Sequence, residues 1–239
     1  MSDLIDLVID AHGGLDRWQQ ARSVSAEVHV RGGFWGFKGQ PGLLGRESVT
    51  ADVHQQRIVL RSGGRTIEFD GAADRVAVRG PGGVVDELSA PRASMAGFQG
   101  DTQWTPAQTG YFISYATWTY LLEPFLFTLP GVQAREIEPW SEVGETWRRL
   151  EVEFPDTVAS HSRTQTYYID ADTGLQRRVD YSPDVNGNPL VAHYTTEHRT
   201  FGGLVVPTRR RVLLRREDGT AMQESAAILL DVSDVRLDA

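Results

Sequence analysis

Short segments in which apolar and polar residues alternate recur along most of this chain. In the first of them, Val24, Ala26, Val28 and Val30 are separated by single polar residues. A period of two is typical of a β-strand that buries one face. Gly-Gly and Asp-Gly turn signals follow many of the segments, so neighbouring strands are joined by hairpin-length connections. We therefore expect one long antiparallel sheet.

Two segments break this pattern with helical spacing. Residues 3–12 carry apolar side chains at helical intervals and end at Gly13-Gly14. A longer helix is expected over residues 107–122, after an N-cap and first-turn pair at Thr105-Pro106. One stripe of this helix is formed by Tyr111, Tyr115, Trp118 and Leu122.

These elements predict a mainly β, α+β fold. A sheet of this length must curl, so we expect a strongly curved antiparallel half-barrel of about 10–11 strands. The sheet would wrap around the N-terminal helix and the central aromatic helix, as a single domain over residues 1–239. Residues 80–104 are weakly patterned and predict the longest loop, whereas residues 32–37 predict a turn with exposed aromatic side chains.

Composition excludes several classes of function. A net charge of −8 is unfavourable for binding nucleic acid or an anionic membrane surface. The absence of cysteine excludes disulfides and thiolate chemistry, and Lys38 is the single lysine. His residues lack metal-ligand spacing, and phosphate-loop, dinucleotide and nucleophile-elbow motifs are absent, so neither a metal nor a cofactor is expected. No segment is long and apolar enough to insert into a membrane. The acidic N-terminus lacks a secretory signal pattern, which favours a cytoplasmic protein.

Four stretches carry a resemblance to a known fold family. They are YIDADTGLQRRVDY, YTTEHRTFGGLVVPTRRRV, AHGGLDRW and YATWTYLLEPF. The first two are similar to the closing hairpins of the LolA/LppX-like lipoprotein carriers, and the last two resemble soluble bacterial proteins on the same fold. The resemblance implies a half-barrel with a cavity between helix and sheet. It also implies a hydrophobic ligand.

The stretch 161–199 has unusual polarity for a structural sheet. It predicts three consecutive strands, near residues 162–170, 175–182 and 190–199. Alternation along the first of these strands places four polar side chains on one face, namely His161, Arg163, Gln165 and Tyr167. On the next strand, Arg178 and Asp180 share a face.

The two hairpin turns suggest how these strands align. A turn about Asn186-Gly187 would place Asp180 opposite His193, and a turn about Asp172-Thr173 would place Gln165 beside Asp180. Gln165, Asp180 and His193 would then form one row, in which the carboxylate orients the imidazole as a general base.

The predicted site has two groups of residues. The catalytic group comprises His193, Asp180, Tyr167 and His161. The substrate-binding group comprises Arg163, Gln165, Arg178, Tyr111, Tyr115, Trp118, Tyr120 and Arg210. Two structural alternatives remain open for the polar strands: a solvated outer face or a buried hydrogen-bond network.

Two functions follow from these patterns. The first is a cofactor-independent acid–base enzyme, of the isomerase, cyclase or lyase type, that acts on a hydrophobic or aromatic small molecule. The second is a carrier or sensor that binds a lipid-like ligand without chemistry. A polar cluster inside the cavity favours the enzyme, whereas an apolar cavity with the polar row outside favours the carrier.

Overall fold

The computed structural model describes residues 3–224 and 226–238 of the chain. Its strands are β1 (Ser23–Arg31), β2 (Arg46–Asp52), β3 (Arg57–Ser62), β4 (Arg65–Asp70), β5 (Arg75–Gly80), β6 (Gly83–Ser89), β7 (Gln133–Glu142), β8 (Glu145–Glu153), β9 (Thr164–Asp170), β10 (Gln176–Tyr181), β11 (Val191–Phe201), β12 (Leu204–Leu214) and β13 (Ile228–Asp238). Its helices are α1 (Asp3–Ala11), α2 (Leu15–Gln19), α3 (Phe34–Phe37) and α4 (Pro106–Leu122), with 3-10 turns η1 (Ala93–Met95), η2 (Phe125–Thr128) and η3 (Asp184–Asn186).

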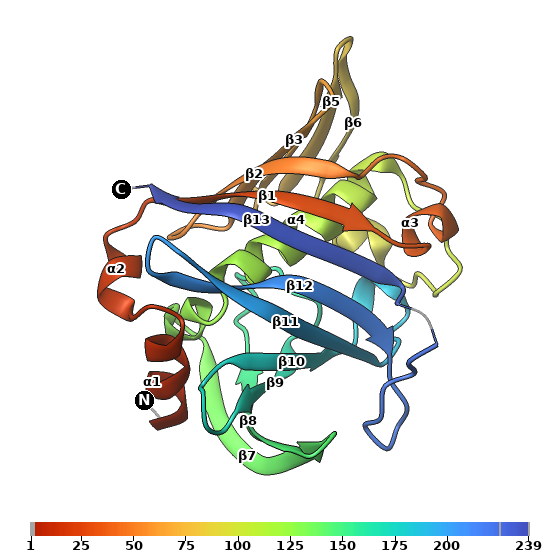
Figure 1. Ribbon diagram of the computed structural model, residues 1–239. Coiled ribbons are helices and arrows are strands. Elements are labelled where there is room, and N and C mark those ends of the chain that lie inside the picture. Colours follow the sequence, from red (N-terminus) through yellow and green to blue (C-terminus); the bar gives the residue numbers. More distant parts are fainter. Residues whose placement is uncertain (1–2, 225, 239) are drawn as a thin grey trace.

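All described strands belong to one curved antiparallel sheet (Figure 1). From β1 the chain runs outward, strand by strand, to β6 at one edge. It then crosses through α4 to β7 at the other edge and returns, again strand by strand, to β13 beside β1. Since β6 and β7 stay unpaired with each other, the sheet is an open half-barrel, as the sequence predicted.

The sheet has 13 strands, more than the predicted 10–11. One of them, β6, lies inside residues 80–104, which the sequence predicted to be a loop. It pairs only with β5, and both of its faces are largely exposed, including Val84 and Val85. A strand with no buried face has no alternating pattern, so its sequence carries little strand signal.

The aromatic turn at residues 32–37 is also different from the prediction. It forms the short helix α3, in which Trp35 is buried and only Phe37 is largely exposed. Because the Trp35 indole is buried in the core, this segment packs against the half-barrel instead of projecting into solvent.

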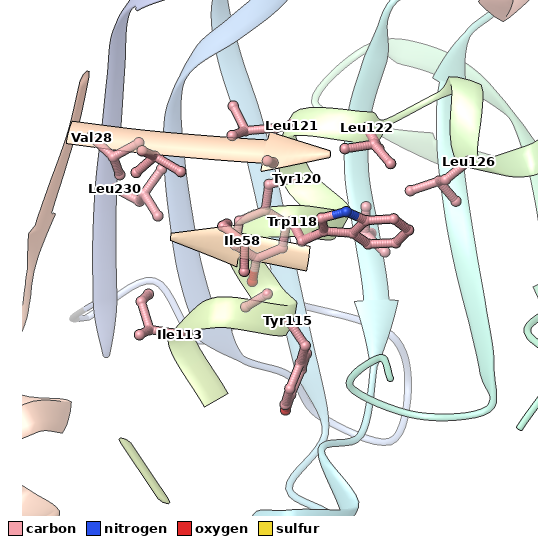
Figure 2. Packing of buried hydrophobic residues seen from close by; sticks show 14 of the residues in the cluster. Val28, Ile58, Ile113, Tyr115, Trp118, Tyr120, Leu121, Leu122, Leu126 and Leu230 are labelled. Atoms are coloured by element: carbon pink, nitrogen blue, oxygen red, sulfur yellow. The ribbon is translucent and has the colours of Figure 1, made fainter. Parts of the chain in front are cut away.

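The central helix, α4, is enclosed by the sheet. A capping box between Thr105 and Gln108, with Pro106 at the first helical position, fixes its start. Its residues from Ala107 to Leu122 are all buried. Figure 2 shows Ile113, Tyr115, Trp118 and Leu121 leaving the helix in different directions into the surrounding core.

The surroundings of α4 are apolar on one side and polar on the other. One side of the helix contacts β3, β4 and β5, where Gly110 approaches Ile67 and Val78 closely. On another side Tyr115 and Tyr120 reach polar groups next to β10 and β11. The helix α1 packs at one end of the half-barrel, where the His12 carbonyl accepts a hydrogen bond from Val205 in β12. No described helix is long and apolar enough to cross a membrane.

We expect the substitution Gly110→Leu to destabilise the fold. A Cβ at Gly110 would lie 3.0 Å from the Ile67 side chain and 3.2 Å from that of Val78. Overpacking of this kind costs about 1–3 kcal/mol. Urea unfolding should show this loss, whereas Gly82→Leu, whose Cβ meets no atom within 4 Å, should leave stability nearly unchanged. Equal stabilities of the two variants would contradict the close packing of α4.

Candidate functional site

The predicted row of Gln165, Asp180 and His193 does not form. Asp180 lies opposite Thr166 on one side and Ala192 on the other. Both hairpins therefore differ by one residue from the predicted register, and a one-residue shift moves a side chain to the other face. A bulge between Gln176 and Arg178 shifts the first hairpin, and η3 replaces a tight turn in the second.

Asp180 and Arg178 lie instead on the face of the sheet opposite α4. Arg178 is fully buried there, and its Nε and Nη2 donate to the two Asp180 oxygens at 2.6 and 2.8 Å. Its other bonds go to Glu142 at 2.8 Å and to the Gly219 carbonyl at 2.6 Å. We call this the outer cluster; it comprises Arg178, Asp180, Glu142, Tyr168, Tyr194 and Arg215. Its charges are paired and covered, so it forms a buried hydrogen-bond network, and none of its residues lines the two cavities described below.

A different set of polar side chains meets on the α4 side of the sheet. Tyr115 and Tyr120 place their hydroxyls 3.3 Å from Nδ1 and 2.8 Å from Nε2 of His161. The Tyr181 hydroxyl lies 3.4 Å from that of Tyr120 and 3.5 Å from Nδ1 of His193. We call these five residues the His–Tyr chain. His161 and His193 are both buried in the interior, and their partners are phenols and not a carboxylate.

Burial controls the protonation of the His–Tyr chain. It lowers the pKa of His161 to about 3, and it also lowers the pKa of His193, to which the nearby Arg210 charge contributes. Burial likewise raises the pKa of Tyr181 and Tyr115. At neutral pH the side chains of the His–Tyr chain are therefore uncharged, and each of its imidazoles carries one donor and one acceptor nitrogen.

Next to this chain lies a buried ion pair at the C-terminal end of α4. Arg210 contacts Glu123 at 2.9 Å and donates to the Tyr120 carbonyl at 2.8 Å. Gln176 donates to Glu123 at 2.9 Å. Because its guanidinium is occupied by these contacts, Arg210 is not available to bind an external anion.

Tyr167 is fully buried, and its hydroxyl has no hydrogen-bond partner among the described residues.

The remaining predicted residues are dispersed. Arg163 is mostly exposed and forms ion pairs with Glu153 and Asp156, because the chain has left the sheet at this point. Gln165 is buried and donates to the Ser162 carbonyl at 3.3 Å. Trp118 points away from the His–Tyr chain and donates to the Asp52 carbonyl at 2.8 Å.

Two cavities open on either side of the His–Tyr chain. The first, the polar cleft, has a volume of about 520 Å³ and is lined by Arg92, Tyr111, Ser160 and Asp184 among others. The Arg92 guanidinium joins these neighbours, donating to Tyr111 at 3.0 Å and contacting Asp184 and the Ser160 carbonyl. Arg92 thus closes the inner end of the cleft, in front of Tyr115.

The second cavity, the apolar pocket, has a volume of about 640 Å³. Its walls come from α3, α4, the loop before α4, the β10–β11 connection and the ends of β11, β12 and β13, and they include Phe34, Phe112, Tyr181, Val191, Val212 and Ile228. Tyr181 is the member of the His–Tyr chain that reaches this pocket, and its ring stacks on His161 with centroids 4.1 Å apart. A volume of this size suits a drug-sized ligand.

The site residues that the prediction missed include Tyr181, Arg92, Glu123 and Asn186. Because side chains alternate along a strand, Tyr181 and Asp180 lie on opposite faces of the sheet. The prediction chose the face of Asp180 and therefore left Tyr181 out. The others lie in loops or just after a helix, where no periodic pattern assigns a side. Among the described residues, no three His, Asp or Glu side chains converge as metal ligands.

Comparisons with solved structures identify the fold. A LolA superfamily protein from Nitrosomonas europaea is 13% identical with a TM-score of 0.54, over 98% of this chain and 94% of that one. A DUF1329 family protein from Desulfovibrio piger is 13% identical with a TM-score of 0.53, over 99% and 92%. The lipoprotein LppX from Mycobacterium tuberculosis is 15% identical with a TM-score of 0.29, over 99% and 100%. No family model and no curated protein matches the sequence. The likeness to the LolA superfamily structure shows that the chain has the LolA-like fold, which confirms the predicted resemblance.

We expect acid to destabilise this protein partly through His161. The imidazole stays neutral in the fold down to pH 3 or so, whereas in the unfolded chain it binds a proton below about pH 6.5. Between these values the unfolded state binds more protons, so stability falls by about 1.4 kcal/mol for each unit of decreasing pH.

Urea unfolding at pH 5.5 and 4.5 measures this dependence. In His161→Gln the loss of stability between the two pH values should be smaller by about 1.4 kcal/mol. The matched control is His54→Gln, at an exposed turn, which should behave as the wild type. An unchanged dependence in His161→Gln would show that the imidazole is not held neutral.

Proposed function

We propose that this protein binds a hydrophobic or aromatic small molecule in the apolar pocket. The observation that carries the proposal is the pocket itself, about 640 Å³ in volume with a predominantly apolar lining. Phe37 and Leu214 line the pocket, and they are 55% and 46% exposed. Large apolar side chains left exposed around a cavity favour a ligand that covers them.

The filled interior of the half-barrel supports the same location. Because α4 is buried along its length, the space under β3, β4 and β5 is occupied by side chains such as Tyr111 and Ile113. A ligand therefore has room at the mouth of the half-barrel without displacement of the helix. The absence of a paired Asp180 and His193 removes the general base predicted from sequence, which favours binding without chemistry, as in a carrier or sensor.

A second proposal, acid–base catalysis in the same pocket, is favoured by one specific contact. Tyr181 lines the pocket, and behind it the hydroxyl lies 3.5 Å from Nδ1 of His193 and 3.4 Å from the Tyr120 hydroxyl. The Tyr181 hydroxyl can take a proton from a bound molecule while its own proton passes to Nδ1 of His193, and the reverse transfer returns a proton to the same molecule. Isomerisation, cyclisation or elimination would use such a step.

Filling the apolar pocket should abolish binding. Gly33 lines it with φ −70°, and a Cβ there would meet no atom within 4 Å, so Gly33→Trp adds an indole without a backbone clash. We expect this variant to bind the neutral fluorescent probe N-phenyl-1-naphthylamine at least about tenfold more weakly, a loss of ~1.4 kcal/mol. The control is Gly82→Trp on the β5–β6 turn, which also has open space around its Cβ. Equal binding by both variants would refute the proposed location.

The substitution Tyr181→Phe separates the two proposals. It keeps the ring that lines the pocket and removes the hydroxyl that faces His193. Native mass spectrometry of the protein from its own host identifies a co-purifying molecule, which is then incubated with each variant. Catalysis predicts unchanged binding and a turnover lower by about 10²-fold or more. If the wild-type protein leaves the bound molecule unaltered, the catalytic proposal fails and the carrier or sensor proposal stands.

A further inference from the structure

The charges around the apolar pocket are one-sided. Asp101 lines it and is exposed, whereas no Lys or Arg is among its lining residues within residues 3–224 and 226–238. Lys38 lies nearby but is fully buried, and its ammonium donates to the carbonyls of Gly100 and Thr102 at 2.5 and 3.2 Å. It is therefore held by the backbone of the loop and is not presented to a ligand.

A neutral acceptor stands on the same wall as Asp101. Asn186 lines the pocket and is 8% exposed, and its Oδ1 is buried without a hydrogen-bond partner among the described residues. The two residues belong to neighbouring segments, because a Cβ at Gly187 would lie 3.1 Å from the Gly100 nitrogen. A buried acceptor without a partner costs about 1–3 kcal/mol, which a donor on a ligand would recover.

The other side chains that line the pocket are largely apolar. They include Phe34, Phe112, Val191, Val212 and Leu213. The pocket thus has an apolar body and one polar wall that consists of a carboxylate and an unpaired amide oxygen. An anionic group on that wall would face Asp101, and the nearby cation, the buried Lys38 ammonium, is already bound to the carbonyls on either side of Asp101. Desolvating a carboxylate without a partner is strongly unfavourable.

We propose that the apolar pocket selects an amphiphile whose polar end donates hydrogen bonds, an alcohol or an amine, and discriminates against carboxylates. This inference rests on the proposed function, since it assigns the chemistry of the same pocket. The Asn186 amide turns its buried oxygen toward the pocket to accept a hydrogen bond from the polar end of the ligand, and Asp101 attracts a cationic form of it. The apolar walls hold the hydrocarbon part.

The test uses three ligands with ten carbon atoms each: 1-decanol, decylammonium and decanoate. Each competes with N-phenyl-1-naphthylamine on the full-length protein at neutral pH. We expect decanol and decylammonium to displace the probe at concentrations at least about tenfold lower than decanoate, a difference of ~1.4 kcal/mol. The comparison of decylammonium with decanoate is decisive because both are ions with ten carbon atoms and opposite charge.

Two variants locate the discrimination on the polar wall. In Asp101→Lys the ratio of decylammonium to decanoate affinity should fall at least about tenfold, whereas Asp16→Lys on the exposed surface of α2 changes the net charge equally and should alter it little. In the wild type, decanol should bind about fivefold more tightly than its isostere methyl nonyl ether, which has no donor. In Asn186→Leu the two should bind equally.

The outcomes separate this inference from the proposed function. If decanoate binds as tightly as decylammonium or more tightly, the selection for a donating polar end is wrong while the pocket remains a binding site. The inference is equally wrong if Asp101→Lys and Asn186→Leu leave every ratio unchanged. If none of the three ligands competes with the probe and the probe itself does not bind, the proposed function fails.

Discussion

The enclosure of α4 by the curved sheet is the constraint on which the rest of this structure depends. A helix buried along its length needs apolar neighbours on one side, and β3 to β5 supply them at the distance that Gly110 permits. On the other side its tyrosines need hydrogen-bond partners, because a buried phenol without one is costly. His161 and Tyr181 supply these partners. The polar interior is thus a consequence of filling a half-barrel with an aromatic helix, and the space for a ligand moves to its mouth.

The two faces of the sheet carry different polar clusters. On the face away from α4, Arg178 and Asp180 form a charged and fully paired outer cluster under the Gly219 loop. On the α4 face, the His–Tyr chain is uncharged at neutral pH because burial lowers the pKa of its imidazoles. Tyr181 therefore connects the apolar pocket to a set of interior side chains that exchange hydrogen bonds without a net charge.

Much of the fold could be predicted from the sequence, because alternation, turn signals and the capping of α4 are local features. The division of each strand into two faces was also predictable, as the shared face of Arg178 and Asp180 shows. The alignment between strands was not, since a bulge near Gln176 and the η3 turn each shift a hairpin by one residue. That shift places Val179, and not Asp180, beside His193. Contacts between distant loops, such as Arg92 with Asp184, leave no periodic signal.

The location of the ligand is the central claim, and intermolecular NOEs test it most directly. Protein with labelled methyl groups is titrated with 1-decanol, and contacts from the chain protons of the ligand to the protein methyls are assigned. The account predicts contacts to Val191, Val212 and Leu213 of the apolar pocket. Contacts instead to Ile67 and Val78, which pack against Gly110 beneath α4, would show that the ligand enters the interior of the half-barrel and would contradict the account.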